Sequence, residues 1–332
     1  MPDTGHKETD ALLEKVEKKV DKVYGKAVKE SQKNLNQYLK RFEKRDKQFQ
    51  RMVKKNEMAK AEYLEWRKSQ MLLNKHFTEV LNTISNDYVN ADKIAMSIVG
   101  DHLPEAYAIN RNFAAFEVEK GSLIDTSFTL YDANTVERLI KEDKSLLPKP
   151  KLDVPKDKRW NQRKIREEIT KSVLKGDSID QVANSLQKVA DMDRSAAIRN
   201  ARTAMTGAQN AGRIDGYVEA KKLGIGIQKE WSATLDSKTR HSHALLDGEH
   251  VDVEAEFSNG CAYPGDPDCK YPEEIYNCRC SLVARLTDFN FAPGERNSKL
   301  GDMSYDEWKD MHRVAFEAAK NIKSNKGGNP NG

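Results

Sequence analysis

Residues 8–100 form a run of helix-favouring sequence that almost nothing interrupts, and this run limits the fold more than any other feature. It contains no proline and only one glycine before Gly100, while Lys, Glu, Gln, Leu, Met and Ala, all good helix formers, are abundant. Apolar residues recur at helical spacing, as in Leu35, Tyr38 and Leu39. The sequence therefore predicts long amphipathic helices whose apolar stripes pack against a neighbouring helix or a partner.

Basic residues are concentrated in the second half of this run. From Lys33 to Lys75 there are 13 Lys plus Arg against 5 Asp plus Glu, a balance of +8, whereas the whole chain carries +4. Such a segment is the electrostatic footprint of contact with DNA or another polyanion, although a solvated helix with lysines on its outer face has the same composition. The candidate DNA-contacting residues are Lys40, Arg41, Lys44, Arg45, Lys47, Arg51, Lys54 and Lys55.

The centre of the chain differs in composition from the helical run before it. Asp101 to Pro104 is predicted to end the helical run, and the β-branched and aromatic residues of 122–132 predict a short strand pair or an extended segment. Prolines at 148, 150 and 155 then predict a linker, since proline disfavours continued helix. The predicted regions are thus a basic helical region, 1–100, and an irregular region with a proline-rich linker, 101–158.

Helical patterns return after the linker, at 160–174, 179–189 and 194–223. The last of these carries small residues, among them Gly207 and Gly212, that allow another helix to approach closely. An alternating, aromatic pattern from Ile225 onward predicts a strand. These patterns define a third region, 159–288. A fourth region, 289–332, is predicted to contain one helix at 305–323, which Ser304 caps, and to end in a disordered tail.

All four cysteines lie between residues 261 and 280, shortly after three of the seven histidines. The chain has neither an apolar run long enough to span a membrane nor a secretion signal, which predicts synthesis in the cytosol, where thiols stay reduced. A metal site is then a more natural use of these residues than a disulfide framework, and zinc takes about four such ligands. The candidate ligands are His243, Cys278, Cys280, His241, Cys261 and Cys269.

Each candidate ligand also has a simpler explanation. Cys261 and Cys269 flank a loop rich in Pro and Gly, so they are bystanders or a redox-sensitive pair in the alternative reading. Cys278 and Cys280 alternate with Arg279 and point to one face of an extended strand, which suits two ligands of one ion and equally two small buried side chains. His250 follows a turn and is a candidate for simple surface exposure.

Several ordered motifs carry a family resemblance. The run WSATLDSKTRHSHALLDG at 231–248, the later NCRC at 277–280 and the upstream RNARTAMTGAQNAGR resemble the C-terminal signature of the phage Mu F-like head morphogenesis proteins, which are minor head proteins of tailed phages. The resemblance covers about residues 160–285. It implies a virion component, present in few copies, that joins the head with the portal vertex and accompanies DNA in packaging and ejection. It also implies a metal role for His243, Cys278 and Cys280, with the fourth ligand undecided.

Two enzymatic alternatives remain beside the structural role. Glu254 and Glu256 have the spacing of the paired carboxylates of mono-ADP-ribosyltransferases, and phage head proteins of this family are sometimes joined to such domains. A metal-dependent nuclease would need an open coordination position and a general base, for which Asp236 or Asp247 would serve beside His241 or His243.

The prediction is a mainly α protein with a small α+β C-terminal module, in which long N-terminal helices precede a helical bundle and a Cys/His metal-knot region holding zinc. Its predicted function is non-catalytic, in head assembly and DNA delivery. The predicted partners are the portal protein, the scaffold or major capsid protein and double-stranded phage DNA, with no membrane required for folding. The predicted location is the inside of the virion head near the portal vertex, after synthesis in the host cytoplasm.

Overall fold

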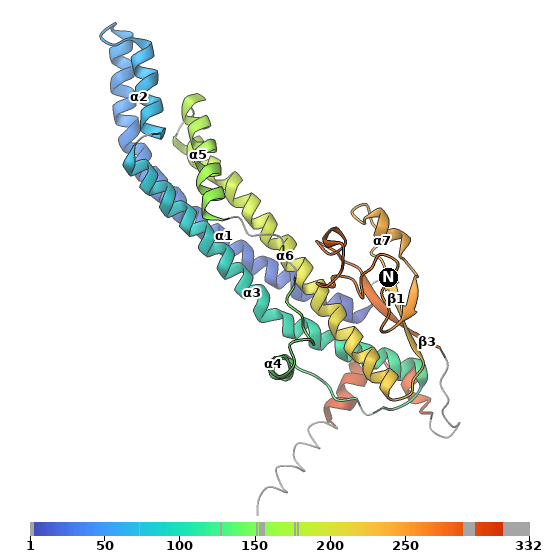
Figure 1. The fold of residues 1–332 in the computed structure, drawn as a ribbon. Helices are drawn as coiled ribbons and strands as arrows, with labels where there is room; N and C mark the ends of the chain where they lie inside the picture. Colours follow the sequence, from blue (N-terminus) through green and yellow to red (C-terminus); the bar gives the residue numbers. More distant parts are fainter. Residues whose placement is uncertain are drawn as a thin grey trace, which may run out of the picture. The chain divides into compact units, whose positions relative to one another are not determined.

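The computed structural model describes residues 3–314, apart from 73, 127, 151, 153–156, 176, 178 and 288–295. The chain is mainly helical, and it contains a small antiparallel sheet (Figure 1). Contacts between residues divide it into two compact units. Unit 1 comprises residues 1–15, 99–152 and the segment that begins at Asn200, and unit 2 comprises 16–98 and 153–199. Three helices contribute residues to both units: α1 (Thr4–Lys54), α3 (Lys75–Ser122) and α6 (Ile179–Lys222).

Unit 2 is helical, and its core is made by the apolar stripes that the sequence predicts. The stripe residues Leu35, Tyr38 and Leu39 are buried, which confirms this part of the prediction. The core also takes side chains from α3, α5 (Lys158–Lys175) and α6. Its further members include Val16, Val20, Tyr24, Phe77, Leu81, Ile84, Tyr88, Ile165, Ile169, Val182, Leu186 and Val189.

The basic end of α1 is paired with a second helix. After α1 ends at Lys54, Asn56 adopts the left-handed conformation (φ 60°), and α2 begins at Lys60 and ends at Leu72. The ring of Trp66 on α2 stacks on Phe42 of α1 with centroids 5.3 Å apart. These aromatic contacts hold the basic half of α1 in a fixed helical hairpin rather than leaving it as an isolated helix.

Two predicted helix breaks are wrong. Helix α3 continues through Pro104 to Ser122, although the sequence predicts an end at Asp101–Pro104 and an irregular region beyond it. Proline removes one intrahelical hydrogen bond, but the burial of Leu103, Ala106 and Tyr107 on the same helix compensates for this loss. Likewise the patterns at 179–189 and 194–223 belong to the single helix α6, because residues 190–193 are also helical.

The segment between α3 and the linker also differs from the prediction. Of residues 122–132, those that the structure describes form no strand, and 128–132 lead into a helix that the sequence analysis missed, α4 (Ala133–Glu142). Asp132 caps this helix by accepting a hydrogen bond from the Thr135 amide (2.7 Å). Pro155 of the predicted linker lies outside the described residues.

Unit 1 contains the sheet, whose strand order is β2-β1-β3, with both pairings antiparallel. The central strand β1 (Ile227–Ser232), predicted from the alternating pattern, is confirmed, and it pairs with β2 (His250–Asp252) and β3 (Ser281–Leu286). Alternate residues of β1 are buried, as in a strand with one face on a core. Short helical segments lie in the connections and beyond the sheet: α7 (His241–Leu245), the 3-10 turn η1 (Pro272–Glu274) and α8 (Lys299–Asp302).

Close packing of α6 on α3 follows from the small residues of α6. A Cβ atom added to Gly212 would lie 2.3 Å from the carbonyl oxygen of Tyr107, and one on Gly216 would lie 2.8 Å from Cβ of Ala114. No side chain fits at these positions without moving the α3 backbone. The close approach that the sequence predicts for this helix is therefore confirmed.

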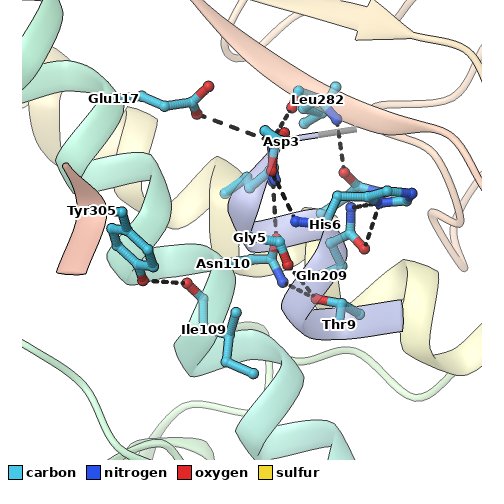
Figure 2. A network of polar contacts seen from close by, with 12 residues as sticks. Asp3, Gly5, His6, Thr9, Ile109, Asn110, Glu117, Gln209, Leu282 and Tyr305 are labelled. Atoms are coloured by element: carbon cyan, nitrogen blue, oxygen red, sulfur yellow. Dashed lines mark hydrogen bonds and ion pairs between the residues drawn. The ribbon is translucent and has the colours of Figure 1, made fainter. Parts of the chain in front are cut away.

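The first turn of α1 is built into the core of unit 1. Asp3 accepts two hydrogen bonds from Arg213 of α6. His6 lies at hydrogen-bond distance from Gln209 of the same helix (Figure 2). The Asn110 side chain donates to Thr9 (2.6 Å). The N-terminal segment is thus part of the unit that carries the sheet.

The C-terminal helix predicted from Tyr305 is present in residues 305–314, and the remainder of its predicted range lies outside the described residues. Ser304 caps it as predicted, since its hydroxyl accepts a hydrogen bond from the Glu307 amide (3.3 Å). Trp308 on this helix is buried and donates to Glu119 (2.6 Å). Among the described residues, no helix is both long and apolar enough to cross a membrane.

Candidate metal centre

His243, Cys278 and Cys280 converge in unit 1, and they are three of the six candidate ligands predicted from the sequence. Nδ1 of His243 lies 3.5 Å from Sγ of Cys278 and 3.4 Å from Sγ of Cys280. All three side chains are buried. They form the metal-compatible cluster found among the described residues, with their ligand atoms all within 4.8 Å of one another.

The other three candidates do not join this cluster. Cys261 and Cys269 are linked to each other by a disulfide, so their sulfur atoms are not available as ligands in this form. His241 is exposed at the start of α7, and His250 is exposed on β2. The expectation that the chain's cysteines serve a metal rather than a disulfide therefore does not hold for Cys261 and Cys269, which the structure bonds to each other across their loop.

Two neighbours orient the histidine. The Trp231 ring of β1 packs edge-on against the imidazole, with centroids 5.4 Å apart. On the other side, Nε2 of His243 lies 2.9 Å from a carboxylate oxygen of Glu274, which also accepts a hydrogen bond from Ser242 (3.1 Å). A carboxylate beside one ring nitrogen favours a proton there and leaves the other nitrogen, Nδ1, with its lone pair toward the two sulfurs.

The thiols of Cys278 and Cys280 have pKa values that are shifted in opposite directions. A hydrogen bond from Cys278, together with the neighbouring His243, lowers the pKa of the Cys280 thiol. The same hydrogen bond and burial raise the pKa of the Cys278 thiol. The two thiols thus lie in unlike electrostatic surroundings, and a bound cation would stabilise both of them as thiolates.

Helix α6 fixes the backbone that carries the cysteines. Hydroxyls of Thr203 and Thr206 bind the Asn277 amide (2.8 Å) and the Cys278 carbonyl (2.7 Å) respectively. One turn further, the Asn210 side chain accepts from the Leu282 amide (2.9 Å) and donates to the Cys280 carbonyl (3.2 Å). Thr206, Asn210 and Glu274 are not among the site residues predicted from the sequence. The 3-4 spacing of Thr203, Thr206 and Asn210 on one helix face was the available signal.

The disulfide-closed loop 261–269 rests on the same face of α6. Gly265 at its tip has φ 80°, and a Cβ atom added there would lie 2.8 Å from the amide nitrogen of Gly207. Asn210 also donates to the Pro264 carbonyl (2.9 Å). One stretch of α6 thus positions both the loop and the segment that carries Cys278 and Cys280.

The signature residues in the connections on either side of α7 form hydrogen-bonded turns. Asp236 makes two hydrogen bonds with Arg279, the residue between the two cysteines (2.5 and 2.7 Å), and Thr239 contacts Asp236. Asp247 accepts from the Ala233 amide (2.8 Å). Arg279 lowers the pKa of the Asp236 carboxyl well below its usual range. This placement supports a positioning role for these residues.

The carboxylates considered for a transferase site lie in a surface turn. Glu254 pairs with Lys221 (3.2 Å) and Glu256 pairs with Lys270 (2.9 Å), and both glutamates are exposed in the turn that follows β2. Ion pairs of this exposed kind are ordinary surface contacts. They give no support to a catalytic pair.

Comparison with known proteins agrees with the signature. A family profile described as "Phage Mu protein F like protein" matches residues 163–283, which include α6, strands β1 and β2, the start of β3 and all three cluster residues. Residues 163–283 therefore form a region similar to the Mu F-like proteins.

Among curated proteins, the chain is similar along nearly its whole length to the minor head protein GP7 of Bacillus phage SPP1. The two are 25% identical over 323 residues, 92% of this chain and 96% of that protein. It is also 33% identical over 149 residues to the NAD(+)--arginine ADP-ribosyltransferase EFV of Enterococcus faecalis, and 27% identical over 125 residues to the uncharacterized protein YqbB of Bacillus subtilis. These two matches cover 43% and 36% of this chain but only 30% and 40% of the relatives. No solved structure matches significantly.

Proposed function

We propose that the chain is a minor head component of a tailed phage, placed inside the head near the portal vertex. The similarity to the SPP1 minor head protein carries this proposal because it extends over both the helical half and the Mu F-like region. The proposed partners are the portal protein, the scaffold or major capsid protein and the packaged DNA. In this role the chain is non-catalytic, and it assists head assembly and DNA packaging or ejection.

The test is direct analysis of purified particles of the phage that encodes the chain. Quantitative mass spectrometry is expected to find the protein in few copies relative to the major capsid protein. Co-expression with the portal protein of the same phage is expected to give a complex on size-exclusion chromatography. Absence of the chain from intact particles would contradict the proposal.

We further propose that His243, Cys278 and Cys280 hold a zinc ion. Tetrahedral zinc at about 2.3 Å from sulfur and about 2.0 Å from nitrogen implies sulfur–nitrogen separations of roughly 3.5 Å. The observed separations of 3.5 and 3.4 Å fit this value, and the donor set of one imidazole and two thiols is one that zinc prefers. The ion would supply charge neutralisation for both thiolates and a link between α7 and the segment before β3.

Elemental mass spectrometry tests the zinc proposal. About one zinc per chain is expected in the wild type, and it is expected to be lost, with thermal stability, in Cys278→Ser and Cys280→Ser. Cys261→Ser is the matched control, since it also removes a buried cysteine but leaves the cluster intact. Equal zinc in all variants would exclude these ligands.

The proposed DNA contact rests on the spacing of the cations on α1. Residues Lys40, Lys44, Lys47, Arg51 and Lys54 follow each other at intervals of four and three, so they share one helix face over roughly 21 Å. All five are exposed, and of these only Lys47 has an ion pair, with Glu43 (2.7 Å). Arg41, Arg45 and Lys55 lie on the adjoining face. A row of exposed cations, of which Lys40, Lys44, Arg51 and Lys54 carry no ion pair, supports contact with a phosphate backbone.

Salt-dependent binding to double-stranded DNA tests this contact. Reversing the charge at Lys40, Lys44, Arg51 and Lys54 is expected to reduce the slope of log affinity against log salt by about 3 to 4. Charge reversal at four exposed lysines of other segments, Lys141, Lys144, Lys149 and Lys175, is the control with the same change in net charge. If both variants lose the same affinity, net charge rather than this helix face is responsible.

A further inference from the structure

A small pocket lies against the metal cluster in unit 1. Its volume of about 20 Å³ has room for roughly one water molecule. Besides the three cluster residues, its lining consists of Thr234, Lys238, Thr239, Arg240, Asn277 and Arg279. The pocket and the three donor atoms therefore share one space.

The described part of the chain supplies three donors to this space, and a tetrahedral ion takes four. Glu274, the nearest carboxylate to the cluster histidine, faces Nε2 on the opposite side of the His243 ring. All three donor residues line the pocket. The fourth coordination position of a bound ion would therefore face the pocket.

Asn277 adds an independent observation. Its side-chain oxygen Oδ1 is buried and has no hydrogen-bond donor, although it lines this polar pocket. The residue is held in the left-handed conformation (φ 55°) with its amide bound to Thr203. A buried acceptor without a donor is destabilising, so its presence in the pocket wall points to a donor that occupies the pocket.

The charge of the pocket indicates what else binds there. A divalent ion and two thiolates together are neutral, and Arg279 is neutralised by Asp236. Arg240 lines the pocket while donating to a neutral carbonyl, that of Tyr276, and the exposed Lys238 lines it as well. Two positive charges thus remain uncompensated by an acidic partner in the pocket wall.

We propose that the metal centre keeps one exchangeable coordination position, where a water donates a hydrogen bond to Asn277 Oδ1 and gives way to a phosphate oxygen drawn in by Lys238 and Arg240. This inference rests on the proposed zinc site. It makes the centre a phosphate-binding site in addition to a structural link.

Cobalt substitution of the full chain tests the inference by spectroscopy. The visible bands of the cobalt form are expected to shift on titration with inorganic phosphate, and to shift likewise with a 5′-phosphorylated oligonucleotide if terminal phosphates also reach the pocket. The same oligonucleotide without its phosphate is the matched ligand control. Lys238→Ala is expected to weaken the phosphate response about fivefold, as expected for one nearby charge, whereas Lys270→Ala, outside the pocket, leaves it unchanged.

Asn277→Gly separates the acceptor from the backbone conformation, since glycine adopts the left-handed region readily. This variant is expected to bind cobalt with altered bands before any phosphate is added. Failure of the wild type to bind cobalt would overturn the zinc proposal itself. Cobalt binding with bands that neither phosphate nor Asn277→Gly changes would overturn only the exchangeable position and leave the zinc site standing.

Discussion

Asp3 and Arg213, separated by 210 positions in the chain, form a two-point ion pair in the interior of unit 1. Nη1 and Nη2 of the arginine lie 2.8 and 2.6 Å from the two carboxylate oxygens. The guanidinium is fully buried, donates through Nε to Asn110 (3.0 Å) and also binds the carbonyl of Leu282 on β3. One side chain of α6 therefore connects the residue before α1, helix α3 and the strand β3.

Replacement of Arg213 by Met is expected to destabilise unit 1 by about 3–5 kcal/mol, because it leaves the largely buried Asp3 carboxylate without its cation. Urea unfolding measures the change. Arg285→Met is the matched control: this arginine is half exposed on β3 and its ion pair with Glu230 is long (3.4 Å), so a loss within about 1 kcal/mol is expected. Equal losses in both variants would contradict the central role of Arg213.

Glu117 gives the stability of unit 1 a defined pH dependence. Burial raises its pKa from 4.5 to about 7, despite the nearby Arg213. The folded chain therefore keeps a proton that the unfolded chain releases, so this group's contribution is complete below about pH 4.5 and is lost as the pH rises to about 7.

The comparison is between wild type and Glu117→Gln across this range. The wild type is expected to lose on the order of 3 kcal/mol more than the variant between pH 4.5 and 7.5. Glu137→Gln, an exposed position on α4, is expected to retain the wild-type slope. A wild-type slope in Glu117→Gln would show that another group titrates.

Gly265 and Gly248 offer a matched pair of glycines, since both have φ near 80° but different surroundings. Alanine at Gly248 meets nothing within 4 Å, so only the conformational cost of about 1 kcal/mol is expected. Alanine at Gly265 also collides with the Gly207 backbone, which adds about 1–3 kcal/mol. Thermal unfolding of both variants checks the difference, and equal shifts would mean that the loop does not press on α6.

Asn210→Ala is expected to lower zinc affinity about 10- to 100-fold without removing a ligand, because Asn210 holds the backbone of Cys280 and Leu282. Competition with a chromogenic chelator measures the affinity. Asn134→Ala, at an exposed position of α4, serves as the control. Unchanged affinity in Asn210→Ala would limit this residue to a purely structural role.

Local patterns in the sequence were sufficient for the parts of the fold that depend on local physics. The helix-forming run, the alternating strand at Ile227 and the small residues of α6 each have a short-range signature. The break predicted at Pro104 failed because tertiary burial outweighed a single proline. The local sequence around a proline does not show how many apolar contacts the helix makes in the folded protein.

In the candidate site, too, some residues could be predicted from the sequence and others could not. Residue chemistry alone pointed to His243, Cys278 and Cys280, but it grouped Cys261 and Cys269 with them, since a spacing of eight does not reveal that a loop closes on itself. Asn210 and Glu274 escaped notice because an amide and a carboxylate acquire their role only from partners that are distant in sequence or around a turn. The fold, and not the local sequence, decides which partners Asn210 and Glu274 contact.

The pairing of Asp3 with Arg213 also sets an order of events during synthesis. At about 5–20 residues per second, the ribosome adds the 210 residues between them in roughly 10–40 seconds. Throughout that interval the N-terminal turn has emerged without the arginine, the strand or the helix face that completes it. The ion pair between Asp3 and Arg213 can therefore form only late in synthesis. Until then the segment around Asp3 is accessible to other partners.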